Sequence, residues 1–126
     1  MLSNANAYSG FAVDDTAKAK EFYGKTLGLK VEDGEMEGLL TIQLAGGRPI
    51  LVYPKPDFEP ATYTILNFEV EDIDETVDDL SSRGVTFERY DGFDQDEQGI
   101  ARGPQGPPIA WFKDPAGNIL AVLEET

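Results

Sequence analysis

Apolar and polar residues follow the same plan twice along this chain. In the first block, a β-prone run at residues 7–13 precedes apolar side chains at helical spacing, and Gly28 ends that helix. The helical stripe consists of Ala19, Phe22, Tyr23 and Leu27, with Asp14 or Asp15 as the N-terminal cap. Three β-prone runs follow, at residues 29–32, 39–44 and 50–53. The first block therefore predicts a β-α-β-β-β unit.

The second block repeats this order. Residues 63–70 are predicted to form a strand, and Asp72 caps a helix with Glu75 three positions later, as in a capping box. This helix ends near Gly84, and residues 85–90 are predicted to form the next strand. Its buried stripe consists of Ile73, Val77 and Leu80.

A common spacing links the two blocks. Val13 stands two residues before Asp15, Val70 stands two residues before Asp72, and a helix is predicted after each pair. This correspondence indicates a duplicated unit. We interpret the chain as one domain, residues 1–126, made of two repeats at 7–54 and 63–124 that are joined by a linker at 55–62.

The chain closes with a predicted hairpin. Asp114 can accept a backbone hydrogen bond at the first position of a turn, Pro115 fixes φ at the second, and Gly117 or Asn118 tolerates positive φ where the chain reverses. Residues 119–123 are continuously apolar, which predicts a largely buried closing strand.

A long stretch rich in glycine and proline, residues 91–108, precedes this hairpin. Long loops inside small domains are usually functional, so we predict that this stretch covers a cavity as a lid. A short strand is expected near residues 100–102.

Composition and charge narrow the possible functions. The chain has 126 residues and contains neither cysteine nor histidine, so disulfides, thiol catalysis and thiolate metal sites are excluded. Ten basic and 24 acidic residues give a net charge of −14, which disfavours nucleic acids and anionic membranes as partners. The sequence shows no membrane span and no signal peptide, so we expect a cytoplasmic protein.

Three segments of the chain together resemble the glyoxalase, bleomycin-resistance and extradiol-dioxygenase superfamily, also called vicinal oxygen chelate proteins. This resemblance implies an α+β fold of two tandem β-α-β-β-β modules whose mixed sheets form a cup around a small ligand, and it implies a homodimer. The residues that carry it are Val13, Asp14 and Asp15 leading to Phe22, Tyr23, Leu27, Gly28 and Leu29; Phe68, Glu69, Val70, Glu71, Asp72 and Ile73; and Trp111, Phe112, Lys113, Asp114, Pro115, Ala116, Gly117 and Asn118.

The resemblance also locates the positions that hold a metal in the metal-dependent members. Carried over to this chain, these positions fall near Tyr8, Leu51, Ile65 and Ala121, and none of them is a usual metal ligand. We therefore expect no metal and no cofactor at the inherited site.

Several other side chains are candidates for a ligand site. If Ile65 faces the cup, strand alternation places Asn67 and Glu69 on the same face, where Glu69 could bind a cation or act as a general base, with a solvated residue near a strand end as the alternative. Tyr53 and Trp111 could stack on a planar ligand, with core packing as the alternative. Arg102 could recognise an anion, with a surface ion pair as the alternative. The predicted ligand-binding set is Tyr8, Leu51, Tyr53, Ile65, Asn67, Glu69, Arg102, Trp111 and Ala121.

Two functions from different classes fit these residues. The first is metal-independent binding of a small hydrophobic or aromatic molecule, neutral or cationic, as in the bleomycin-resistance branch. The second is an enzyme, a glyoxalase-type lyase or isomerase or a dioxygenase, with a non-standard site that uses Glu69. The missing metal donors favour the binding protein over the enzyme.

Overall fold

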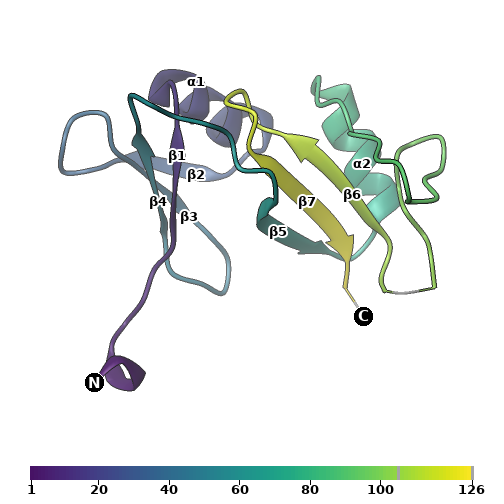
Figure 1. The fold of residues 1–126 in the computed structure, drawn as a ribbon, viewed down its shortest axis with the longest axis horizontal. Coiled ribbons are helices and arrows are strands. Elements are labelled where there is room, and N and C mark those ends of the chain that lie inside the picture. The colour runs from purple at the N-terminus through teal and green to yellow at the C-terminus, as the bar shows by residue number, and fades with distance from the viewer. Residues whose placement is uncertain (105, 126) are drawn as a thin grey trace. The chain divides into compact units, whose positions relative to one another are not determined.

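The computed structural model describes residues 1–104 and 106–125. The chain divides into two compact units, Met1–Glu59 and Pro60–Thr126, which are described one at a time. Each unit combines a mixed β-sheet with helical segments, so the predicted α+β class is confirmed (Figure 1). Among the described residues, no helix is long and apolar enough to cross a membrane.

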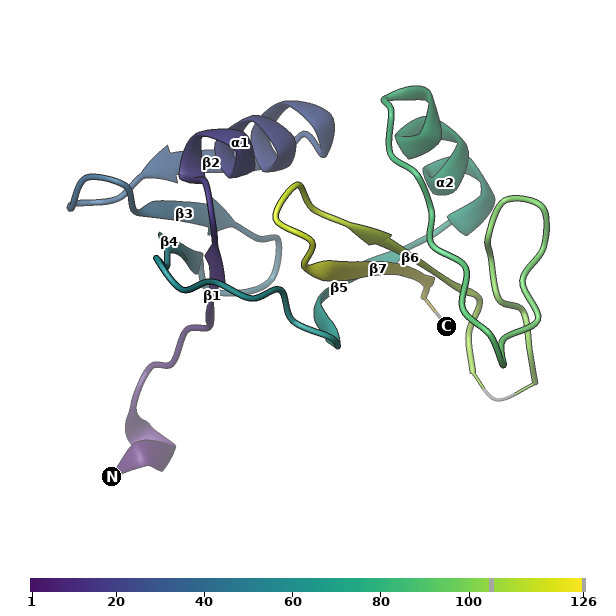
Figure 2. The same ribbon diagram turned by 45° about the horizontal axis from the view of Figure 1, so that its top comes forward.

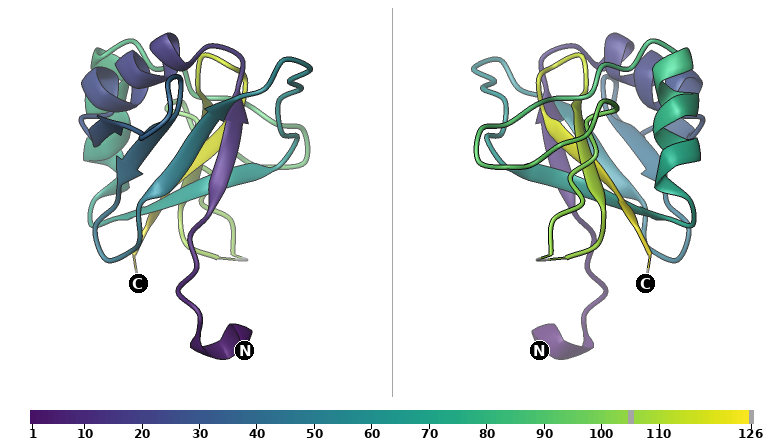
Figure 3. Two further views of the ribbon diagram at one scale, coloured as in Figure 1. Left: turned by 90° about the vertical axis from the view of Figure 1, so that its left-hand side faces the viewer. Right: turned by 90° about the vertical axis from the view of Figure 1, so that its right-hand side faces the viewer.

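The first unit is built on a four-stranded sheet. Its elements are the 3-10 helix η1 (Leu2–Asn4), β1 (Gly10–Val13), α1 (Thr16–Glu21), the π-helix η2 (Phe22–Thr26), β2 (Lys30–Asp33), β3 (Leu40–Gln43) and β4 (Ile50–Pro54). The strand order is β1-β4-β3-β2, with β1 parallel to β4 and the other neighbours antiparallel. Figure 3 shows these strands side by side.

The helical segment of the first unit begins as predicted and then changes type. The Asp15 carboxylate accepts a hydrogen bond from the Lys18 backbone N–H at 3.2 Å, which caps α1. The turn then widens, because the Leu27 N–H donates to the carbonyl of Phe22, five residues earlier, at 2.9 Å. Tyr23 is fully buried in this wider turn, and its ring packs against the ring of Phe11.

The second unit repeats the strand arrangement of the first with one strand fewer. Its elements are β5 (Thr64–Val70), α2 (Ile73–Ser82), β6 (Ile109–Lys113) and β7 (Ile119–Glu124). The strand order is β5-β7-β6, with β5 parallel to β7 and β7 antiparallel to β6. Asp72 caps α2 by accepting from the Glu75 N–H at 3.1 Å, the same offset that Asp15 uses in the first unit.

The strand expected at residues 85–90 is reduced to a single bridge, between Phe87 and Phe112, and this prediction was wrong. A side-chain amide explains the difference. Gln95 accepts from the Tyr90 N–H at 2.8 Å and donates to the Glu88 carbonyl at 2.9 Å, so it takes the place of a strand partner. The strand expected at 100–102 is likewise limited to isolated bridges at Ala101.

The sheet of the second unit has one face that packs on α2 and one that does not. Ala110 and Phe112 in β6, and Leu120 and Val122 in β7, are buried with the stripe of α2 and form the core of this unit. Figure 2 shows α2 lying over one side of these strands. Residues that alternate with them, among them Trp111 and Leu123, therefore lie on the face that α2 leaves open.

The turn between β6 and β7 is built on the buried carboxylate of Asp114. Its Oδ1 accepts from the N–H groups of Ala116 and Asn118 at 3.0 and 2.8 Å. The Gly117 N–H donates to the Asp114 carbonyl, and Gly117 has a φ of +96°, as the sequence predicted for one of the last two turn residues. The Asn118 Oδ1 then accepts from the Ala61 N–H at 3.2 Å, which ties the turn to the start of the unit.

We expect Asp114→Ala to lower the free energy of unfolding by about 2 kcal/mol, because two turn N–H groups would lose a buried acceptor. Asp14→Ala is the matched control, because it removes the same charge at an exposed position. It should change the free energy of unfolding by no more than about 0.5 kcal/mol. Urea unfolding of the two variants measures both values. Equal unfolding midpoints would contradict the role assigned to Asp114.

Candidate ligand-binding site

The open face of the sheet in the second unit carries two rows of side chains. Asn67, Ala121 and Trp111 are register partners across β5, β7 and β6, and they form the first row. Glu69, Leu123 and Ile109 form the second row. Register partners point to the same side of a sheet, so all six side chains belong to the face that α2 leaves open.

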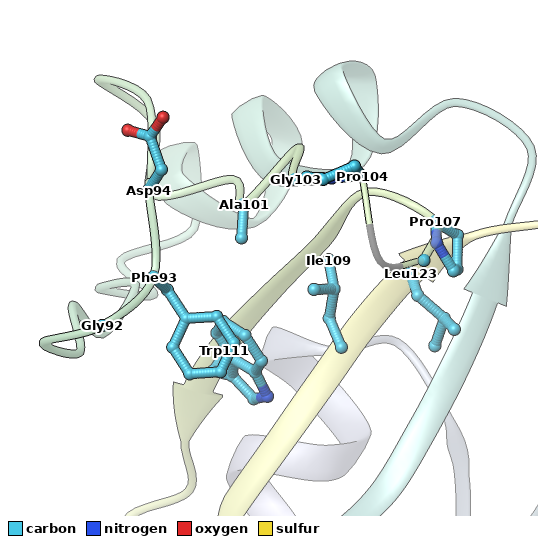
Figure 4. Close-up of a pocket in the computed structure, with 11 residues that line it drawn as sticks. Gly92, Phe93, Asp94, Ala101, Gly103, Pro104, Pro107, Ile109, Trp111 and Leu123 are labelled. Atoms are coloured by element: carbon cyan, nitrogen blue, oxygen red, sulfur yellow. The ribbon is translucent and has the colours of Figure 1, made fainter.

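A cavity of about 520 Å³ lies against this face. Two sheet strands supply Ile109, Trp111 and Leu123, and the loop between α2 and β6 supplies the rest. The loop residues at the cavity are Gly92, Phe93, Asp94, Ala101, Gly103, Pro104, Gly106 and Pro107. Figure 4 shows the rings of Phe93 and Trp111 together at one side of the cavity, whereas the carboxylate of Asp94 extends away from them.

Three aromatic rings form a cluster centred on Trp111. The ring centroid of Phe93 lies 4.9 Å from that of Trp111, and the ring of Tyr90 meets Trp111 edge-on at 5.5 Å. Phe93 remains 54% exposed although it touches Trp111. A planar apolar molecule could therefore replace water against Phe93 and Trp111 and gain stacking area.

The loop that forms the cavity wall is held by the side chain of Gln95. Besides its bonds to Tyr90 and Glu88, the Gln95 amide donates to the Gly99 carbonyl at 2.8 Å. Gly99 has a φ of +94°, and a Cβ there would lie 3.2 Å from the Cβ of Phe87. These contacts fix the fold of the segment that we predicted to be a lid.

A second set of bonds joins this wall to α2. Asp96 Oδ1 accepts from the N–H groups of Gln98 and Ile100, and its Oδ2 accepts from Arg102 Nε at 3.1 Å. Arg102 also forms an ion pair with Asp74 in the first turn of α2. Partial desolvation raises the pKa of Asp96, but the hydrogen bonds from Ile100, Arg102 and Gln98 together outweigh it and leave this pKa below its usual value.

The hydroxyl of Tyr90 is buried and has no hydrogen-bond partner among the residues that the structure describes. Desolvation, with a smaller contribution from the charge of Glu88, raises the pKa of this phenol above its ordinary value. The phenol is therefore protonated at neutral pH. Leaving such a donor unpaired in a folded protein costs about 1–3 kcal/mol.

The structure brings several of the predicted residues of the second unit to one face. Trp111 lines the cavity. Asn67 and Glu69 are exposed on β5, and Ala121 is completely buried between its row partners. Ile65 lies at an irregularity in the pairing of β5 with β7. Arg102 is engaged with Asp74 and Asp96 and is absent from the cavity lining, as its alternative interpretation anticipated.

Two of the three predicted residues of the first unit lie on the corresponding face of the other sheet. Leu51 and Tyr53 are both on β4 and alternate with the buried Ile50 and Val52. Tyr8 precedes β1 and is 66% exposed. Each of these side chains thus lies outside the core of its unit.

The positions that would hold the metal of the metal-dependent relatives do not fit a metal ion. Leu51, Ile65 and Ala121 have no donor atom in their side chains. Elsewhere in the described chain, one acidic group has carboxylate oxygens within 4.8 Å of one another; it consists of Asp72, Asp74 and Glu124.

These three acidic side chains already have partners. Asp72 caps α2, Glu124 Oε2 accepts from the Ile73 N–H at 3.1 Å, and Asp74 pairs with Arg102. Negative charge at the start of α2 is also favourable for the helix. The group therefore serves the N-terminus of α2.

Sequence reasoning missed Ile109, Leu123 and Phe93 in the cavity lining. The first two could have been found, because each stands two positions from a predicted site residue, Trp111 or Ala121, on the same strand. Phe93 gave no such signal, since it lies in a loop without periodicity.

Comparisons with known proteins bear on this architecture. The model of the Glyoxalase/Bleomycin resistance protein/Dioxygenase superfamily matches residues 7–122. The uncharacterized protein YraH of Bacillus subtilis (strain 168) is 32% identical in a match that covers 89% of this chain and 91% of that protein.

Solved structures show the same fold. A superfamily member from Sphaerobacter thermophilus DSM 20745 has a TM-score of 0.73 at 26% identity, covering 96% of this chain and 98% of that one. TnmS3, an antibiotic binding protein from Streptomyces sp. CB03234, has a TM-score of 0.71 at 22% identity and 98% coverage of both chains. The fosfomycin resistance protein FosX from Listeria monocytogenes has a TM-score of 0.72 at 15% identity, covering 98% and 94%. The resemblance seen in the sequence is confirmed, and this chain belongs to the Glyoxalase/Bleomycin resistance protein/Dioxygenase superfamily.

Proposed function

We propose that this protein binds a small, planar, largely apolar molecule, neutral or cationic, in the cavity beside Trp111 and does so without a metal. The observation that carries this proposal is the pairing of an exposed ring, Phe93, with Trp111 at the edge of a cavity of about 520 Å³. This volume lies within the range of about 300–1,000 Å³ that small-molecule sites usually have.

The charges at the cavity support a neutral or cationic ligand. Asp94 is the one charged residue among the described residues that line it, and no lysine or arginine is among them. The protein as a whole carries a net charge of −14, which attracts cations and repels anions. Fosfomycin carries an anionic phosphonate, so a role like that of the FosX relative has no support from this cavity.

The relatives offer a precedent for binding. TnmS3 is described as an antibiotic binding protein and shares the fold of this chain. An antibiotic is therefore one class of small molecule that we propose for this site. A dimer is also proposed, because the superfamily resemblance implies one and because each sheet has outer strands, β1 and β2 in one and β5 and β6 in the other, whose free edges could pair.

Enzymatic use of Glu69 has less support. Its side chain is exposed on β5 and is not among the residues that line the cavity. A general base has to reach the proton that it removes in a plausible substrate position. The geometry therefore favours ligand binding over catalysis by Glu69.

We expect Phe93→Ala to weaken the binding of aromatic compounds about three- to tenfold, because an exposed ring that stacks on the ligand is lost. The free energy of unfolding should change by no more than about 0.5 kcal/mol. Tyr63→Ala removes another exposed ring of the same unit, outside the cavity lining, and should leave binding unchanged. Calorimetric titration of a panel of hydrophobic and cationic aromatic compounds measures these affinities, and equal losses in both variants would place the ligand elsewhere.

Trp111→Ala should weaken binding by about tenfold or more, a loss of ~1.4 kcal/mol, and should lower stability by a smaller amount. The reason is that this ring lies between the sheet and the cavity and is only half-buried. Measuring the changes in binding free energy and in free energy of unfolding for this variant shows which of the two losses is larger. If stability falls more than affinity, Trp111 belongs to the core.

Protein purified without added metal is expected to contain less than about 0.1 equivalent of zinc, nickel, manganese or iron, because the inherited positions lack donor atoms. Elemental analysis measures this content. Treatment with a chelator should leave aromatic binding unchanged. A stoichiometric metal, or binding that is lost on chelation, would favour the metalloenzyme instead.

A further inference from the structure

The hydroxyl oxygen of Tyr90 is a buried polar atom whose surroundings give it no hydrogen-bond partner among the described residues. The hydroxyl is shielded from solvent and finds no partner within residues 1–104 and 106–125. Buried polar groups in folded proteins are normally hydrogen-bonded, so an exception calls for a cause. A phenylalanine would make the same ring contact with Trp111 without the unpaired oxygen.

The position of Tyr90 links this atom to the aromatic cluster. The ring centroids of Tyr90 and Trp111 lie 5.5 Å apart in a T-shaped arrangement, and Trp111 in turn contacts Phe93 at the cavity. The Tyr90 backbone N–H donates a hydrogen bond to the Gln95 side chain, which fixes the position of the Tyr90 backbone. Tyr90 does not line the cavity itself, and its ring is one aromatic contact away from it, through Trp111.

We infer that the Tyr90 hydroxyl is a specificity-determining hydrogen-bond donor, which pairs with an acceptor atom of an aromatic ligand stacked on Trp111. The inference rests on the proposed function and narrows its ligand class to aromatic compounds that carry a carbonyl oxygen or a ring nitrogen. The raised pKa of the phenol keeps its proton available for donation at neutral and moderately alkaline pH. Because the hydroxyl is shielded, ligand entry has to include a side-chain rearrangement, and Phe93 is the exposed ring of the cluster.

A donor kept for a ligand has two consequences of opposite sign. In the unliganded protein the unpaired hydroxyl destabilises the folded state, so its removal should increase the free energy of unfolding. In the complex the hydroxyl is paired, so its removal should reduce affinity for ligands with an acceptor. A residue that serves packing alone would not combine these two effects.

The first measurement is urea unfolding of unliganded Tyr90→Phe. Its unfolding midpoint should rise above that of the wild type. Tyr63→Phe is the matched control, since it removes the oxygen of an exposed tyrosine in the same unit, and its midpoint should not change. A lower midpoint for Tyr90→Phe would overturn the inference, because it would show that the hydroxyl is already paired.

The second measurement compares two probes of similar shape, 2-acetylnaphthalene, which carries a carbonyl acceptor, and 2-ethylnaphthalene, which has none. Equilibrium dialysis should show that Tyr90→Phe binds the ketone about fivefold more weakly than the wild type, whereas the hydrocarbon is bound equally by both proteins. Tyr63→Phe should bind both probes as the wild type does.

The outcomes separate this inference from the proposed function. If the wild type binds both probes and Tyr90→Phe changes neither affinity, or changes both by the same factor, the role of Tyr90 is overturned and the aromatic site stands. If the wild type binds neither probe, the proposed function and the role of Tyr90 fall together.

Discussion

The alternation of side chains along β6 and β7 is the constraint on which the rest of this structure depends. Phe112 and Leu120 point to α2 and close the core, and their neighbours Trp111 and Leu123 are thereby directed to the opposite face. One pair of strands thus supplies the packing of the second unit and the floor of a cavity. A shift of one residue in the pairing of these strands would exchange the two sets.

The turn at Asp114 and the bonds of Gln95 keep this arrangement in place. Asp114 sets where β6 ends and β7 begins, and thereby fixes the register between Trp111 and Ala121. Gln95 replaces the backbone of a missing strand, so the chain leaves the sheet near Tyr90 and forms the cavity wall. The first unit has a full strand, β2, at the corresponding place. The second unit therefore has one strand fewer than the first, and a loop that lines a cavity occupies that place.

The sequence contained the signals for most of the fold. The strand runs, the caps at Asp15 and Asp72 and the turn at Asp114 are local features, and local patterns determine them. The strand expected at residues 85–90 failed because the Glu88 carbonyl and the Tyr90 N–H bond to the side chain of Gln95, and a side-chain contact leaves no periodic pattern. The π-helix after Glu21 was not predicted, because apolar spacing does not distinguish a π-helix from an α-helix.

The candidate site was harder to derive than the fold. Alternation placed Asn67, Glu69 and Trp111 on one face, but which of them reaches a cavity depends on where the loop folds back. The loop has no periodicity, so the sequence could not indicate the place of Phe93 or the burial of the Tyr90 hydroxyl. Arg102 shows the opposite case, because its charge suggested a ligand contact whereas Asp74 and Asp96 engage it.

Methyl NMR spectra recorded during titration with 2-acetylnaphthalene test the central claim most directly, because neighbouring residues of β7 report on opposite faces. We expect ring-current shifts at the methyl groups of Leu123 and Ile109, which line the cavity, and unchanged signals from Leu120 and Val122, which face α2. Shifts confined to Leu120 and Val122, or no shift at Leu123 while the compound binds, would contradict the assignment of the site to the open face of the sheet.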